Sequence, residues 1–95
     1  MATTKVPFNK TGIGNLPNNK PVVYEIQTDG GRNIYVGFAQ RGRVQERLKE
    51  HLPGGKDPVP GAKVQIKQMP SIDDARAREA RIIRESQPPH NKQGK

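Results

Sequence analysis

Glu79 is a polar residue at a position where a core residue belongs. A helix through this region, at about 100° per residue, gathers four apolar residues into one stripe: Ile72, Ala75, Ile82 and Ile83. Glu79 falls within that stripe, and an inward carboxylate costs free energy unless it is paired or binds a cation. The pattern indicates a metal-binding or catalytic carboxylate, or else a slightly rotated helix in which Glu79 lies nearer the surface and pairs with an arginine.

A second polar pair, Arg47 and His51, stands four residues apart in a segment that lacks glycine and proline. Residues at this spacing lie on neighbouring turns of one side of a helix. Val44 and Leu48 mark the inner face of that helix, and His51 lies close to the direction of Val44. The forked donors of Arg47 suit a phosphate. For this helix alone, a solvated Arg47 beside a half-buried His51 is the competing interpretation.

Both tyrosines of the chain lie in a predicted hairpin. Tyr24 shares a strand face with Val22 and Ile26, whereas Tyr35 shares a face with Gly37. A glycine in a strand lets a backbone or a ligand approach closely. Tyrosines in strands usually serve packing, so this pair gains meaning only beside the other polar residues.

The elements that must position these residues are two strands at residues 21–27 and 33–39, a helix at 43–52, a third strand at 62–69 and a helix from 71 to about 85. The turn signal at residues 28–31 makes the first two strands a hairpin. Ser71 is the expected N-cap of the last helix. The sequence thus predicts an α+β fold, a three-stranded antiparallel sheet with flanking helices in the order β-β-α-β-α.

Length and composition favour one small domain. The 95 residues divide into an N-terminal arm or loop at 1–20, a domain at 21–91 and a polar tail at 92–95. There is no cysteine, no apolar run near the roughly 20 residues that span a membrane, and no apolar stretch of a secretory signal at the N-terminus. We expect a soluble cytoplasmic protein that does not engage membranes.

The charge balance points to a polyanionic partner. Seventeen Lys and Arg against nine Asp and Glu give a net charge of +8. Each phosphate that such a chain neutralises releases condensed counterions, which favours binding. The same excess of charge also suits an acidic protein partner, or simple solubility.

Together these residues resemble the GIY-YIG nuclease superfamily, as a small single-domain member. The two segments that name the family read here Val22-Val23-Tyr24 and Tyr35-Val36-Gly37. The later motif positions are matched, in chain order, by Arg47, His51, Glu79 and Asn91. The resemblance covers residues 21–91 and rests on the order and spacing of the motifs, since no single motif is specific. It implies a metal-dependent endonuclease that hydrolyses phosphodiester bonds, with DNA as the expected substrate.

The resemblance also implies roles for the site residues. Glu79 would anchor one Mg²⁺ or Mn²⁺ ion, with water and phosphate oxygens in the other positions. Arg47 would contact the phosphate, and Tyr24 would orient or deprotonate the attacking water. Deprotonation needs positive charge near Tyr24, from Arg47 and the metal, because an ordinary tyrosine has a pKa of about 10. Tyr35 would position the phosphate or the water, and His51 would accept a proton or orient Tyr24.

Further positions complete the expected site. Asn91 would tie the C-terminal tail to it by hydrogen bonds. The expected nucleic-acid contacts are Gly37, Arg41, Arg43 and Lys49. Phe38 stands where many members of the family carry a lysine. If that lysine helps to depress the pKa of the tyrosine, this chain must use another group or react slowly.

Two other functions fit the same sequence. One is a nucleic-acid-binding module that has lost catalysis. It is favoured by Phe38 and by the altered first segment, in which Val22 stands where the family usually has glycine and Val23 where it has isoleucine. The other is a basic protein-interaction domain, which explains the charge but not Glu79 within an apolar stripe. A chain of 95 residues has no room for a separate sequence-reading domain. Specificity would then come from loops, from nucleic-acid shape, from a partner protein or from a homodimer that cuts both strands.

Overall fold

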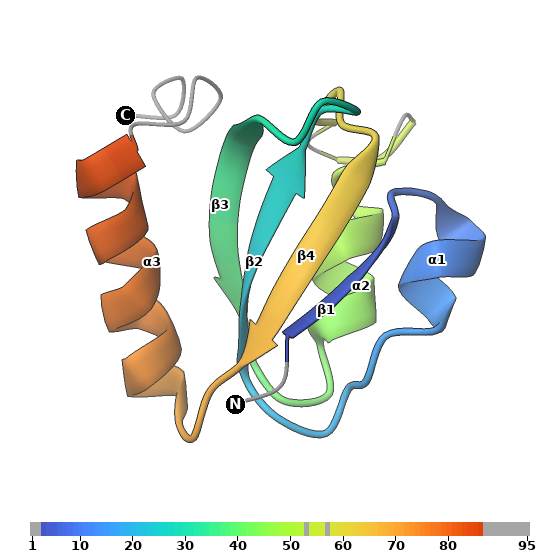
Figure 1. The fold of residues 1–95 in the computed structure, drawn as a ribbon. Coiled ribbons are helices and arrows are strands. Elements are labelled where there is room, and N and C mark those ends of the chain that lie inside the picture. The colour runs from blue at the N-terminus through green and yellow to red at the C-terminus, as the bar shows by residue number, and fades with distance from the viewer. Residues whose placement is uncertain (1–2, 53, 57, 87–95) are drawn as a thin grey trace.

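A sheet separates two layers of helices in the computed structural model, which describes residues 3–52, 54–56 and 58–86 (Figure 1). The elements, in chain order, are β1 (Thr3–Pro7), α1 (Lys10–Gly14), β2 (Val22–Gln27), β3 (Asn33–Ala39), α2 (Val44–Lys49), β4 (Lys63–Gln68) and α3 (Ile72–Ser86). Helix α3 lies on one face of the sheet, and α1 and α2 lie on the other. The α+β class is confirmed.

The sheet has four antiparallel strands in the order β1-β4-β2-β3, so the prediction of three strands in a β-β-α-β-α chain was wrong. The predicted hairpin is present, with Tyr24 opposite Gly37. The extra strand comes from the N-terminal segment expected to be an arm or loop, and Thr3 to Pro7 pair with Lys67 to Lys63 of β4. A proline is tolerated there because β1 is an edge strand.

The same segment also forms the short helix α1. Asn9 is its N-cap, with a side-chain oxygen that accepts a hydrogen bond from the Gly12 N–H at 2.7 Å. Phe8, Ile13 and Leu16 are buried in the core beneath it. These apolar residues are widely spaced among Gly, Asn and Pro, so no helical or strand period marks them in the sequence.

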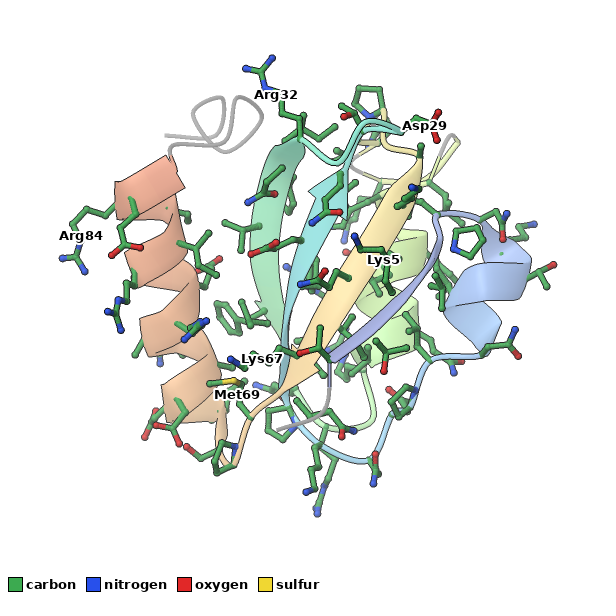
Figure 2. All side chains as sticks on the ribbon, viewed as in Figure 1. Lys5, Asp29, Arg32, Lys67, Met69 and Arg84 are labelled. Atoms are coloured by element: carbon green, nitrogen blue, oxygen red, sulfur yellow. The ribbon has the colours of Figure 1, made fainter. Side chains whose placement is uncertain are left out.

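Each face of the sheet buries its own apolar cluster, because residues alternate between faces along a strand. Val22, Tyr24 and Ile26 of β2 join the larger cluster, which includes Val44 and Leu48 of α2. Val23 of β2, Val36 of β3, Met69 and Ala75 form the smaller cluster under α3. Figure 2 shows Met69 between the end of β4 and α3, whereas Arg84 projects from α3 away from the sheet. The two valines of the altered first motif therefore serve packing.

The N-termini of the two helices that carry the polar residues are both capped by side chains. Ser71 caps α3 as predicted, because its hydroxyl oxygen accepts from the Asp74 N–H at 3.2 Å. Helix α2 is capped from a distance, since the Asn18 side chain accepts from the Val44 N–H at 2.8 Å.

Among the described residues, no helix is both long and apolar enough to cross a membrane. Asn91 and the tail at 92–95 lie outside the described residues.

Candidate active site

Tyr24 is buried at the centre of the candidate site. Its side chain is fully inaccessible to solvent although it lies on β2, next to the edge strand β3. The hydroxyl is hydrogen-bonded to Nε2 of His51 at 2.9 Å. A buried hydroxyl requires such a partner, because an unsatisfied one costs about 1–3 kcal/mol. The hydrogen bond links the first motif segment to the histidine beyond α2.

His51 is held in place by its backbone and by both tyrosine rings. It is 2% exposed, and its carbonyl oxygen accepts from the Val59 N–H at 2.9 Å. The imidazole centroid lies 5.7 Å from the ring of Tyr24 and 4.7 Å from the ring of Tyr35. The two tyrosine rings are stacked with centroids 6.3 Å apart. The interpretation of His51 as half-buried is therefore replaced by a fully enclosed imidazole within an aromatic cluster.

Gly37 makes room for Tyr24. A Cβ atom at this glycine would meet the Tyr24 hydroxyl oxygen at 2.5 Å and Cζ at 2.6 Å. Side-chain atoms do not approach so closely, so the phenol can lie across β3 only because residue 37 has no side chain. The close approach expected at Gly37 is made by the tyrosine of the neighbouring strand.

We therefore expect Gly37→Ala to destabilise the protein by roughly 1–3 kcal/mol, because the added methyl overpacks a buried site. The measurement is the urea midpoint, monitored by circular dichroism. Gly30→Ala is the matched control, since the nearest atom to its Cβ is Thr28 Oγ1 at 4.0 Å. Equal midpoints for the two variants would contradict this account of Gly37.

Arg47 and Glu79 shift the pKa of Tyr24 in opposite directions. Burial raises the pKa of Tyr24 well above its ordinary value, and the nearby Tyr35 and Glu79 raise it further. The positive charge of the Arg47 guanidinium lowers the pKa, but burial dominates. Within the protein's own groups, the positive charge of Arg47 does not make Tyr24 a phenolate near pH 7. Arg47 and Glu79 are thus both near enough to act on one phenol, although they come from helices on opposite faces of the sheet.

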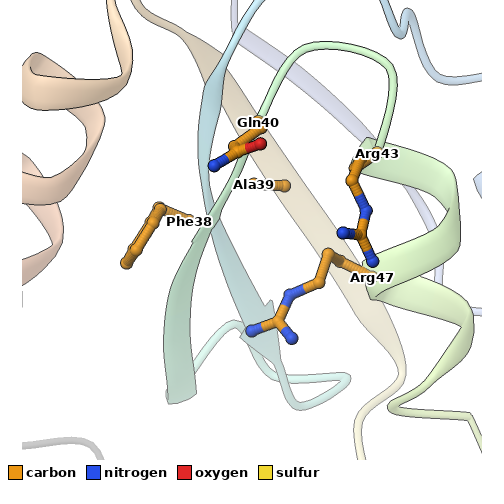
Figure 3. Close-up of a pocket in the computed structure, with 5 residues that line it drawn as sticks. All are labelled: Phe38, Ala39, Gln40, Arg43 and Arg47. Atoms are coloured by element: carbon orange, nitrogen blue, oxygen red, sulfur yellow. The ribbon is translucent and has the colours of Figure 1, made fainter.

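Two hollows lie along β3. The first has a volume of about 210 Å³ and lies between β3 and α2, where Arg43 and Arg47 line it (Figure 3). The second has a volume of about 650 Å³ and lies between β3 and α3, where the half-buried Glu79 lines it. Phe38 of the edge strand β3 and Gln40, which follows that strand, line both hollows. Glu79 is therefore half-buried and faces a solvent-accessible space between β3 and α3.

The donor set suits a metal that takes few protein ligands. Among the described residues there is no group of three or more His, Asp and Glu side chains able to hold a metal ion. A closed site, such as structural zinc requires, is thus not formed by these residues. Glu79 and Asp73 each offer a carboxylate to the larger hollow. That arrangement fits Mg²⁺ or Mn²⁺, which keep several waters and bind through one or two carboxylates together with substrate phosphates.

The expected nucleic-acid contacts lie in different places. Arg43 lines the smaller hollow and forms an ion pair with Glu46 at 3.3 Å. Arg41 is exposed in the turn between β3 and α2, and Lys49 is exposed at the end of α2, outside both hollows. Gly37 is buried under Tyr24 and supports the site from within. Asn91 lies outside the described residues.

Two residues of the hollows carry no signal in the sequence. Gln40 follows β3 directly, and Arg76 stands on the first turns of α3. Neither interrupts an apolar pattern, so nothing distinguishes them from ordinary surface residues until the helices are packed on the sheet.

Comparisons with family models, curated proteins and solved structures find no match to this chain.

Proposed function

We propose that the chain is a metal-dependent endonuclease that hydrolyses phosphodiester bonds at the edge of β3, with DNA as the expected substrate. One observation carries the proposal: Tyr24 is hydrogen-bonded to His51 and is near enough to Arg47 and Glu79 for both charges to act on its pKa. These are the motif positions through which the sequence resembles the GIY-YIG nucleases. Phosphodiester hydrolysis requires a cationic hydrogen-bond donor, a carboxylate and a proton-accepting pair around one point.

Glu79, through a bound metal ion, and Arg47 would stabilise the negative charge that develops during the reaction. Glu79 would hold one Mg²⁺ or Mn²⁺ ion from the wall of the larger hollow. When bound, such an ion supplies Lewis-acid stabilisation of the leaving 3′ oxygen. Arg47 projects from α2 towards β3 (Figure 3), where its guanidinium can donate two hydrogen bonds to phosphate oxygens. It would thereby offset the negative charge that builds up on the phosphorus oxygens.

Tyr24 and His51 would handle the proton of the attacking water. A neutral phenol, as the raised pKa of Tyr24 implies, is a weak base by itself. Its oxygen can accept a proton from a water that enters when the substrate binds, while its own proton passes to Nε2 of His51, provided that the imidazole carries its proton on Nδ1. The water oxygen then bonds to phosphorus and the bond to the 3′ oxygen breaks. His51 is therefore the final proton acceptor, and Tyr24 is the relay.

Incubation of the protein with supercoiled plasmid, single-stranded DNA and RNA tests the proposal. Each substrate is combined with Mg²⁺, with Mn²⁺ or with chelator. Cleavage that depends on the metal is expected with at least one substrate. Metal-independent binding without cleavage would favour the nucleic-acid-binding module, which Phe38 in the usual lysine position supports. Neither binding nor cleavage would favour the basic interaction domain.

Binding should weaken steeply as salt is added. Basic side chains are spread over the surface, and Figure 2 shows Arg32 at the hairpin turn and Lys67 on β4. If about four to six phosphates are contacted, the slope of log K against log salt should be roughly −3 to −5 by counterion release. Fluorescence anisotropy with a labelled oligonucleotide in chelator measures that slope. A flat profile would argue for an uncharged or protein partner.

A further inference from the structure

The larger hollow, between β3 and α3, has the features of a nucleobase pocket. Its volume of about 650 Å³ lies within the range of pockets that hold small molecules, roughly 300–1,000 Å³. Phe38, Ile72 and two alanines of α3 provide an apolar lining, and Gln40 and Arg76 add polar groups. Glu79 forms part of the same wall. Whatever occupies the hollow is therefore next to the proposed reacting phosphate.

Phe38 gives this hollow an aromatic surface. The ring is half-buried, packs against the apolar cluster under α3, and points towards α3 rather than towards Arg47 (Figure 3). It also lines the smaller hollow on the other side of β3. An aromatic side chain offers a π-face on which any base can stack, which makes it a common platform in proteins that bind single strands. A lysine at this place would offer charge but no such platform.

The polar residues around the ring suit a base flanked by phosphates. The side-chain amide of Gln40 and the carboxylate of Asp73 line the hollow and can pair with donors and acceptors on a base edge. Arg76 lies on the α3 side, and Arg43 and Arg47 lie on the α2 side. A strand that crosses β3 would therefore meet a cation on each side of Phe38, in a chain with a net charge of +8.

We propose that this hollow receives an unpaired base next to the scissile phosphate, so that the substrate is single-stranded nucleic acid or a duplex with an unpaired nucleotide. The inference rests on the proposed nuclease function, because that function places the phosphate at Glu79. A base within a regular duplex is stacked and paired and cannot enter such a hollow without being extruded, which costs a few kcal/mol. Phe38 and Gln40 are thereby specificity residues, not catalytic ones.

Binding of three labelled oligonucleotides, measured by anisotropy in chelator so that none is cut, tests this inference. The first is a perfect duplex, the second is the same duplex with one unpaired nucleotide, and the third is the single strand. The wild type should bind the second and third about tenfold more tightly than the first, since one stacked base contributes on the order of tenfold or more. Phe38→Leu should lose most of that preference and bind the perfect duplex as before. Phe38→Tyr should keep the preference.

Phe8→Leu is the matched control, because it changes the other phenylalanine of the chain, which lies in the cluster on the opposite face of the sheet. It should leave the preference intact. Equal affinity of the wild type for all three oligonucleotides, or an equal loss on all three with Phe38→Leu, would overturn the inference. The proposed nuclease fails on a different result, the absence of metal-dependent cleavage. A preserved base preference without cleavage would therefore contradict the proposed nuclease function but support the base pocket.

Discussion

Glu79→Gln is expected to lose cleavage activity by at least about 10³-fold, the upper end of what removal of one charge-stabilising group costs. The substitution keeps the size of the side chain and its place in the larger hollow, but removes the charge that would hold the metal. Affinity for nucleic acid in chelator should stay unchanged or rise up to about fivefold, since one negative charge near the phosphate is lost. Single-turnover cleavage and anisotropy measure the two effects.

The matched control for this prediction is Glu85→Gln on the same helix. Glu85 is 64% exposed and pairs with Arg81 at 3.5 Å, away from the hollow. It should leave the cleavage rate within about twofold of the wild type, because exposed ion pairs contribute little. Wild-type cleavage by Glu79→Gln would remove Glu79 from the site. A parallel loss in Glu85→Gln would show that the effect comes from the net charge of α3.

Tyr24→Phe and Arg47→Ala should each reduce the single-turnover rate by about 10²-fold or more. The first removes the hydroxyl that would relay the proton to His51, and the second removes the guanidinium that would contact the phosphate. The double variant should be little slower than either single variant, because groups that act on one step fail together. Rates that multiply would mean that the two side chains act independently.

Stability must be followed alongside these rates. Loss of the Tyr24 hydroxyl leaves Nε2 of the buried His51 without that hydrogen bond, which costs about 1–3 kcal/mol. Assays therefore run at a temperature at which denaturation curves show each variant to be folded. Arg81→Ala serves as the arginine control, since its guanidinium is 65% exposed and pairs only weakly with Glu85. It should cut at the wild-type rate.

Local sequence patterns predict most of the elements around the site. The hairpin, the third predicted strand and the capped last helix follow from strand alternation, turn residues and Ser71, all of which are local signals. Glu79 was identifiable because it interrupts an apolar stripe. The structure adds that the face of α3 with Glu79 meets the edge strand β3. The Tyr24 hydroxyl lies against Gly37 of that strand, and Arg47 lines the hollow on its other side.

Other features depend on packing between distant segments. Strand β1 forms because Thr3 to Pro7 pair with the free edge of β4, which lies far away in the chain. Gln40 and Arg76 gain their places only when the helices pack on the sheet. The ionisation of Tyr24 was also beyond the sequence, which pointed to positive charge from Arg47. Burial is the larger effect, and it depends on Gly37 and on the surrounding core.

The dependence of cleavage on Mg²⁺ tests the central claim most directly. Wild-type protein is mixed with an end-labelled single-stranded oligonucleotide in chelator, and free Mg²⁺ is then raised stepwise while the initial rate is recorded. The account predicts no cleavage in chelator, a rate that rises and saturates with Mg²⁺, and products with 3′-hydroxyl ends that a polymerase can extend. A folded protein that binds the oligonucleotide but leaves it intact at every concentration of Mg²⁺ or Mn²⁺ would contradict the account.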